Sequence, residues 1–124
     1  MPPTILVVED EPAVLDLVKA ILRRHGFQVL CAADAQGAMD HWSDHAAVID
    51  LLLTDVMLSD GISGLTLGRR LREEKPGLRV LFTSGYNAEA MDWVREFHRG
   101  DAFLRKPYEL DALVGTVRRL LAPL

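Results

Sequence analysis

The sequence predicts a single α/β domain built on a parallel sheet. Short, continuous apolar runs recur along the chain at intervals too long for hairpins, and segments with helical spacing lie between them. Runs of this kind suit strands that are buried on both faces, as the strands of parallel sheets are. A length of 124 residues suits one domain with one core. We therefore expect strands that alternate with helices through right-handed crossovers.

Five apolar runs predict the five strands of this sheet. They cover residues 5–8, 27–31, 51–53, 80–82 and 102–104. Polar residues or glycine precede all five runs, which is typical of strand ends.

Five helices are predicted between and after these runs. The first begins at Pro12, which a first helical turn tolerates, and ends before Gly26. Apolar residues three and four positions apart predict the others: residues 34–45, a helix through Leu67 and Leu71 that ends before Pro76, residues 91–97, and residues 110–121.

Composition narrows the class of protein. The chain has 18 acidic and 14 basic residues, a net charge of -4, and one cysteine, which cannot form an internal disulfide. No apolar run approaches the roughly 18 residues of a membrane span, and no basic leader opens the chain. We expect a soluble, cytoplasmic domain over residues 1–124, without an effector domain, that binds neither membranes nor nucleic acid.

Polar residues follow the predicted strands. Glu9 and Asp10 come after the first strand, Asp55 after the third, Ser84 after the fourth and Lys106 after the fifth. The carboxyl ends of parallel strands lie on one edge of a sheet, and ligands bind outside that edge. We expect these side chains to converge there.

Such a convergence needs compensating positive charge. At about 5 Å, two carboxylates repel by about 3 kcal/mol at an effective dielectric of 20. Lys106 can offset one charge, and a few hard oxygen ligands favour Mg²⁺ for the rest. Three carboxylates, a lysine and the Ser84 hydroxyl form a phosphoryl-transfer constellation, in which one aspartate can become an aspartyl phosphate.

The motifs Glu9-Asp10, Asp55, Ser84-Gly85 and Lys106-Pro107 together resemble the receiver domains of two-component response regulators. The resemblance covers essentially the whole chain. It implies a flavodoxin-like, doubly wound sheet of strand order 2-1-3-4-5 with five helices. It also implies phosphoryl transfer from a histidine kinase or histidine phosphotransfer protein to a monomer or weak dimer, which signals through a partner protein in trans. Turnover would be limited to phosphoryl acceptance and slow autodephosphorylation.

The resemblance also assigns roles to residues. Asp55 would accept the phosphoryl group, and a cis bond would join Lys106 to Pro107. The metal would be Mg²⁺, held by Asp10, Asp55 and the backbone carbonyl of Met57, with Glu9 assisting through water. The phosphate-binding and switch residues would be Ser84, Gly85, Lys106, Phe103 and Tyr86.

Two departures qualify this resemblance. The loop after Asp55 is one residue longer than in the commonest receivers, a form similar to receivers of hybrid histidine kinases. Phe103 stands at the aromatic switch position, where tyrosine is frequent, so its inward rotamer gains burial only and Tyr86 is the alternative.

Other interpretations of the same residues remain. Glu9 and Asp10 could be helix-capping acids, and Asp55 a turn residue. A whole-domain alternative is a docking module that works without phosphorylation; another is a receiver excised from a hybrid histidine kinase. A phosphohydrolase is disfavoured, because Met57 stands where such enzymes place a second acid.

Outside these motifs we expect no further site. His41 and His45 have zinc-binding spacing but lack a third ligand, and a solvated face is the favoured interpretation. The arginines at 69, 70 and 72 are expected on exposed helix faces. Cys31 is expected in the core, and Trp42 and Trp93 at core edges or partner contacts.

Overall fold

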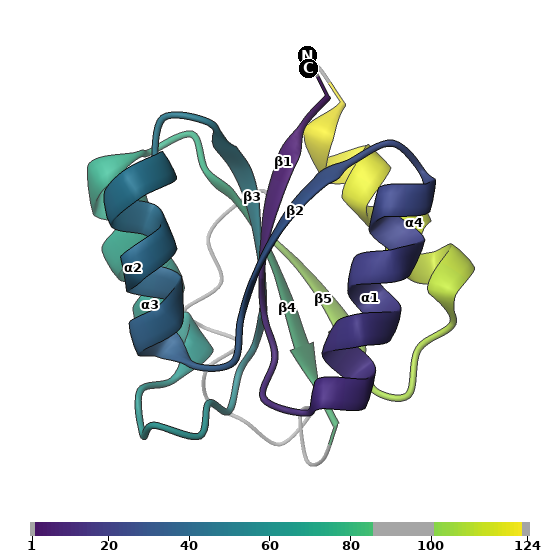
Figure 1. Ribbon diagram of the computed structural model, residues 1–124, viewed down its shortest axis with the longest axis horizontal. Helices are drawn as coiled ribbons and strands as arrows, with labels where there is room; N and C mark the ends of the chain where they lie inside the picture. Colours follow the sequence, from purple (N-terminus) through teal and green to yellow (C-terminus); the bar gives the residue numbers. More distant parts are fainter. Residues whose placement is uncertain (1, 86–100, 123–124) are drawn as a thin grey trace.

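The chain forms a three-layered α/β domain in the computed structural model, which describes residues 2–85 and 101–122 (Figure 1). Its parallel sheet has the strand order β2-β1-β3-β4-β5. The strands are β1 (Thr4–Val8), β2 (Gln28–Ala32), β3 (Ile49–Asp55), β4 (Arg79–Ser84) and β5 (Ala102–Arg105). The predicted flavodoxin-like fold is confirmed.

Four helices occur in the described residues. They are α1 (Pro12–Arg24), α2 (Ala35–His45), α3 (Gly64–Glu74) and α4 (Leu110–Leu121). Figure 1 shows α2 and α3 on one face of the sheet and α1 and α4 on the other. The fifth predicted helix, at residues 91–97, lies outside the described residues together with Tyr86 and Trp93.

Alternate residues of each strand supply two separate cores. Leu6 and Val8 of β1 pack in the cluster under α2 and α3, whereas Ile5 and Val7 pack in the cluster under α1 and α4. All four are at most 1% exposed. This burial on both faces explains why the strands read as continuous apolar runs.

Strand ends differ from the sequence prediction for local reasons. β2 begins at Gln28 because the Phe27 backbone N–H still bonds Leu22 O (3.1 Å), after Gly26 turns the chain at φ +92°. β3 and β4 run on through Asp55 and Ser84, since these polar residues continue the pairing with the neighbouring strands. Both site residues therefore end strands instead of following them.

The surroundings of Arg72, Trp42 and Cys31 test what the sequence predicted for these side chains. Arg72 is not a solvated arginine: it forms an ion pair with Asp101, whose side chain is 1% exposed. Arg69 and Arg70 are exposed, as predicted. Trp42 is 2% exposed and belongs to the core. Cys31 is only partly buried, against the α1–α4 cluster.

Candidate functional site

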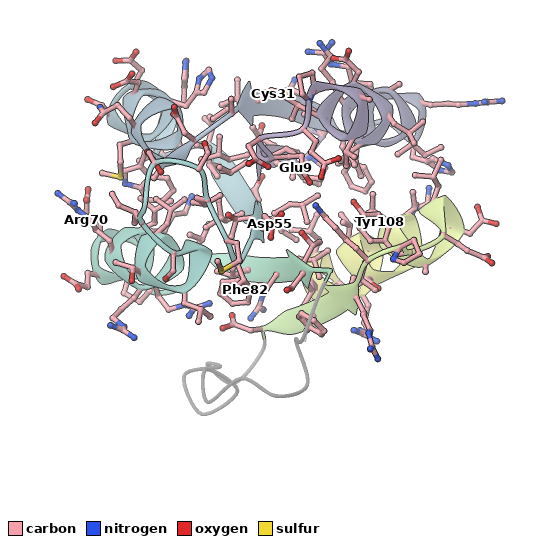
Figure 2. The ribbon with its side chains drawn as sticks, turned by 90° about the horizontal axis from the view of Figure 1, so that it is seen from below. Glu9, Cys31, Asp55, Arg70, Phe82 and Tyr108 are labelled. Carbon is pink, nitrogen blue, oxygen red and sulfur yellow. The ribbon has the colours of Figure 1, made fainter. Side chains whose placement is uncertain are left out.

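Three acidic side chains meet at the carboxyl edge of the sheet. Glu9 and Asp10 follow β1, and Asp55 ends the adjacent strand β3. One ligand atom from each lies within 4.8 Å of those of the other two. Figure 2 looks onto this edge, with Glu9 and Asp55 near the middle of the domain. The predicted convergence is therefore present.

Lys106 bridges two of these acids from the far side of β4. Its Nζ donates to Glu9 Oε1 (2.6 Å) and to Asp55 Oδ2 (3.0 Å). Its backbone N–H donates to Ser84 O (2.8 Å), and the predicted cis bond to Pro107 is present. Burial acts to lower the Lys106 pKa, but the hydrogen bonds to both carboxylates outweigh it and raise the pKa.

Glu9 is the buried member of the acidic cluster, at 4% exposure. Its Oε1 accepts from Lys106, and its Oε2 accepts from the Glu11 backbone N–H (3.1 Å). Burial raises the Glu9 pKa, against the opposing effect of these two hydrogen bonds. Asp10 is exposed and the Asp55 side chain is 13% exposed, against 5% for the Glu9 side chain, so Asp10 and Asp55 are the more open ligands.

The loop after Asp55 folds back on the site. The Met57 backbone N–H donates to Asp55 Oδ1 (3.2 Å), and the Met57 side chain is 72% exposed. Gly64 opens α3 against this loop, where a Cβ would lie 2.1 Å from the Asp55 carbonyl oxygen. Only glycine fits there. Our sequence reasoning assigned Gly64 no role, although its place after the helix-capping Ser63 was a usable signal.

The remaining predicted residues lie around this centre. Ser84 is 5% exposed at the end of β4. Gly85 is exposed, and a Cβ built on it would lie 3.8 Å from Lys106 Cβ. Phe103 in β5 is partly buried against the α2–α3 cluster. Their expected switch roles stay predictions.

The donor set fits a hard divalent cation. All three carboxylates offer oxygen, the ligand atom that Mg²⁺ prefers. Within residues 2–85 and 101–122, Glu9, Asp10 and Asp55 form the one grouping of three or more candidate metal ligands. His41 and His45 belong to no such grouping: His41 Nε2 donates to Cys31 O (2.9 Å), and the ring centroids of the two histidines lie 6.3 Å apart.

None of the described helices is long and apolar enough to span a membrane.

A groove of about 610 Å³ adjoins the acidic centre on the α1 side. Val14 and Leu17 line it from α1, and Pro107 and Tyr108 from the chain after β5. Gly85 and Lys106 reach its wall, so the groove leads to the site. Burial raises the pKa of the Tyr108 hydroxyl. We did not predict this groove, because it depends on how α1 and the β5–α4 connection pack.

Curated proteins are similar to this chain in sequence. The chain is 34% identical over 120 residues to the probable transcriptional regulatory protein TcrX of Mycobacterium tuberculosis. The alignment covers 97% of this chain and 50% of that protein. It is 32% identical over 118 residues to the sensor kinase CckA of Brucella abortus. This alignment covers 95% of this chain and 12% of the kinase. The chain thus spans half or less of the length of these curated relatives.

Solved structures of receiver domains have the same fold as this chain. The receiver domain from the hybrid histidine kinase CckA superposes with a TM-score of 0.81 at 36% identity, covering 96% of this chain and 99% of that one. A response regulator receiver protein from Sinorhizobium medicae gives a TM-score of 0.87 at 27% identity, covering 97% and 94%. Residues 5–118 match the family model of the response regulator receiver domain. The chain therefore belongs to the receiver domain family of two-component response regulators.

Proposed function

We propose that this chain accepts a phosphoryl group from a phosphohistidine onto Asp55, with Mg²⁺ in the acidic centre. The observation that carries the proposal is the double contact of Lys106 Nζ with Glu9 Oε1 and Asp55 Oδ2. It places a cation beside the proposed nucleophile, at the edge where an anionic group would arrive.

The transfer is a displacement at phosphorus. An Asp55 carboxylate oxygen attacks, the phosphorus–nitrogen bond of the donor breaks, and its electron pair returns to the imidazole. Mg²⁺ would be held by Asp10, Asp55 and the Met57 carbonyl, and Glu9 would assist through water. The metal would supply positive charge that offsets the carboxylates and the phosphoryl oxygens. Lys106 would clamp a phosphoryl oxygen, Ser84 would donate to another, and Gly85 would leave room for the group.

The output would be a change of surface that a partner protein reads. A phosphoryl group adds negative charge at Asp55 and attracts Ser84 and Lys106. We propose that Phe103 or Tyr86 follows this movement, and that the domain acts in the cytoplasm as a monomer or weak dimer. Dephosphorylation would be slow, since Met57 offers no general base for water. No other turnover is proposed.

We further propose that the donor protein docks along the groove beside α1. Lys106, which contacts Asp55, and Gly85 are among the residues that line the groove, so a helix lying in it would bring its histidine close to Asp55. Leu17, 53% exposed on α1, offers apolar area to such a partner.

Leu17→Ser should slow transfer from a histidine kinase by about tenfold and leave the reaction with acetyl phosphate unchanged. Val48→Ser, at a 51% exposed residue between α2 and β3, is the matched control. Equal kinase rates for both variants would exclude this docking site.

The decisive experiment is intact mass measurement after incubation with acetyl phosphate and Mg²⁺. The wild type should gain one phosphate-sized adduct, and Asp55→Asn should gain none. An absent adduct with Mg²⁺ present would refute phosphoryl acceptance and favour a docking module that works without phosphorylation. Sustained phosphate release at many turnovers would point to a hydrolase instead.

One feature of the loop after Asp55 favours a more specific setting. Its extra residue is the form similar to hybrid-kinase receivers, and the receiver of the hybrid histidine kinase CckA is among the solved structures that this chain resembles. Under this second candidate, the chain would exchange its phosphoryl group with a histidine phosphotransfer protein. Faster transfer from such a protein than from an isolated kinase would support it.

A further inference from the structure

The loop between β3 and α3, residues 56–63, is held at its base. The Val56 backbone N–H donates to Thr83 O in β4 (2.9 Å), and the Gly64 N–H donates to Val56 O (2.7 Å). Val56 is 4% exposed and Leu58 9% exposed, so both side chains anchor the loop in the α2–α3 core. The base of the loop is therefore part of the rigid domain.

The tip of this loop is tied to a different helix. Asp60 Oδ2 accepts a hydrogen bond from the Gln36 backbone N–H in the first turn of α2 (3.1 Å). Next to Asp60, Gly61 turns the chain at φ +86°, and its N–H donates to Leu58 O (3.3 Å). The tip thus connects the strand that ends in Asp55 to a helix that contributes no residue to the acidic centre.

The first turn of α2 is a firm attachment point. The α2 cap residue Asp34 accepts from the Gly37 N–H through Oδ1 (2.8 Å). Ala35 is 1% exposed and Ala38 is completely buried, so this turn packs directly on the core. The positive end of the helix dipole favours a carboxylate at this position, which strengthens the Asp60 contact.

Met57 lies between the buried residues Val56 and Leu58, ahead of the loop tip. Its N–H bonds Asp55 Oδ1 (3.2 Å), and its exposed side chain provides no anchor of its own. The Met57 carbonyl belongs to the peptide that joins Met57 to Leu58. Its direction therefore depends on the path of residues 58–60, which the buried Leu58 side chain and the Asp60–Gln36 contact fix together.

We propose that Asp60 is a positioning residue for Mg²⁺: by tying the loop tip to α2, it holds the Met57 carbonyl ready for the metal. This inference rests on the proposed function, which supplies the carbonyl as a ligand. It adds that metal binding and the first turn of α2 are physically connected through the Asp60–Gln36 contact.

Titration with Mg²⁺, followed by ¹⁵N NMR on the full chain, tests this connection. Asp60→Ala should raise the Kd for Mg²⁺ about two- to fivefold, the range of a charge contact at a helix end. Asp60→Asn loses the same charge but keeps an acceptor oxygen, so its Kd should stay closer to that of the wild type. The Gln36 amide signal should move with Mg²⁺ in the wild type and stay still in Asp60→Ala.

Asp34→Ala is the matched control, since it also removes one acid from the N-terminal end of α2. It should lower the melting temperature and leave the Kd near the wild-type value. Equal Kd values for Asp60→Ala and the wild type would overturn the inference. Equal weakening by Asp60→Ala and Asp60→Asn would also overturn it, because charge alone would then explain the effect. If the wild type itself bound no Mg²⁺, the proposed metal function would be what had failed.

Discussion

The two helical layers of this domain are joined to their surroundings in different ways. In the α2–α3 layer, Lys75 Nζ reaches from the end of α3 to Ala46 O (3.0 Å) and Ile49 O (2.6 Å), beyond the end of α2. Trp42 Nε1 of α2 donates to Glu74 of α3 (3.3 Å). Arg72 adds the ion pair to Asp101 before β5. Polar contacts therefore cross-link this layer at several points.

The α1–α4 layer depends more on apolar packing. Among its few side-chain hydrogen bonds in the described residues are Arg118 to His25 Nδ1 (3.1 Å) and the long contact of Arg23 with Val29 O (3.5 Å). This layer also borders the open groove beside the acidic centre. The two layers therefore differ in what they do for the site. Contacts of the cross-linked layer hold the loop after Asp55, and the other layer borders the groove that we propose as the docking site.

Removing the cation that pairs with the buried Asp101 in the cross-linked layer should have the largest effect on stability. Arg72→Met leaves the 1% exposed Asp101 side chain without its guanidinium partner, so the free energy of unfolding should fall by about 3 kcal/mol. Urea denaturation measures it. Arg118→Met, at the exposed pair of the other layer, should cost less than about 0.5 kcal/mol. Equal losses would remove the contrast between the layers.

Glycines in the two layers should respond in opposite directions. Gly64→Ala places a Cβ 2.1 Å from the Asp55 carbonyl oxygen and should lower the free energy of unfolding by about 1–3 kcal/mol. Gly115→Ala, inside α4 where the new Cβ meets no other part of the domain within 4 Å, should raise it by about 0.5–1 kcal/mol. Thermal melts compare both variants, and a stabilised Gly64→Ala would contradict the close approach.

A smaller loss is expected where Lys75 closes the end of α2. Lys75→Met removes the hydrogen bonds to Ala46 O and Ile49 O, and the free energy of unfolding should fall by about 1–2 kcal/mol. Lys19→Met on α1 is the control from the other layer and should change stability by less than about 0.5 kcal/mol. A neutral Lys75→Met would mean that these carbonyls are equally well solvated by water.

The fold and the centre of the site were predictable for a common reason. Continuous apolar runs identified the five strands found in residues 2–85 and 101–122. Because a parallel sheet brings all strand ends to one edge, Glu9, Asp10, Asp55 and Lys106 could be placed together from the sequence. Strand ends were less predictable, because Asp55 and Ser84 are polar residues that nevertheless continue the pairing.

The contacts that differ between the layers were not predictable. Arg72 with Asp101, and Asp60 with Gln36, join residues 29 and 24 positions apart. Neither pair has a periodic pattern or a known spacing, because each depends on where α3 and its preceding loop come to lie. The role of Gly64 likewise depends on how closely the start of α3 approaches Asp55.

The smallest effect on stability is expected from Cys31, the one cysteine of the chain. Its side chain packs on the α1–α4 side of the sheet, and its carbonyl oxygen accepts a hydrogen bond from His41 of α2. Burial raises its pKa above the ordinary 9.0, against the opposing charges of Lys19 and Arg23. The folded chain thus keeps the thiol proton at pH values where the unfolded chain has released it. This contribution to stability is complete below pH 9.0 and falls as pH rises through the folded pKa.

Iodoacetamide kinetics measure the Cys31 pKa directly. The pH of half-maximal alkylation should lie above 9.0 in the folded chain and near 9.0 in urea. Cys31→Ala should flatten the decline of stability at alkaline pH, which separates the thiol from the other groups that titrate there. A pH of half-maximal alkylation at or below 9.0 in the folded chain would show that β2 opens to solvent, and that the α1–α4 layer covers this edge strand less well than its packing indicates.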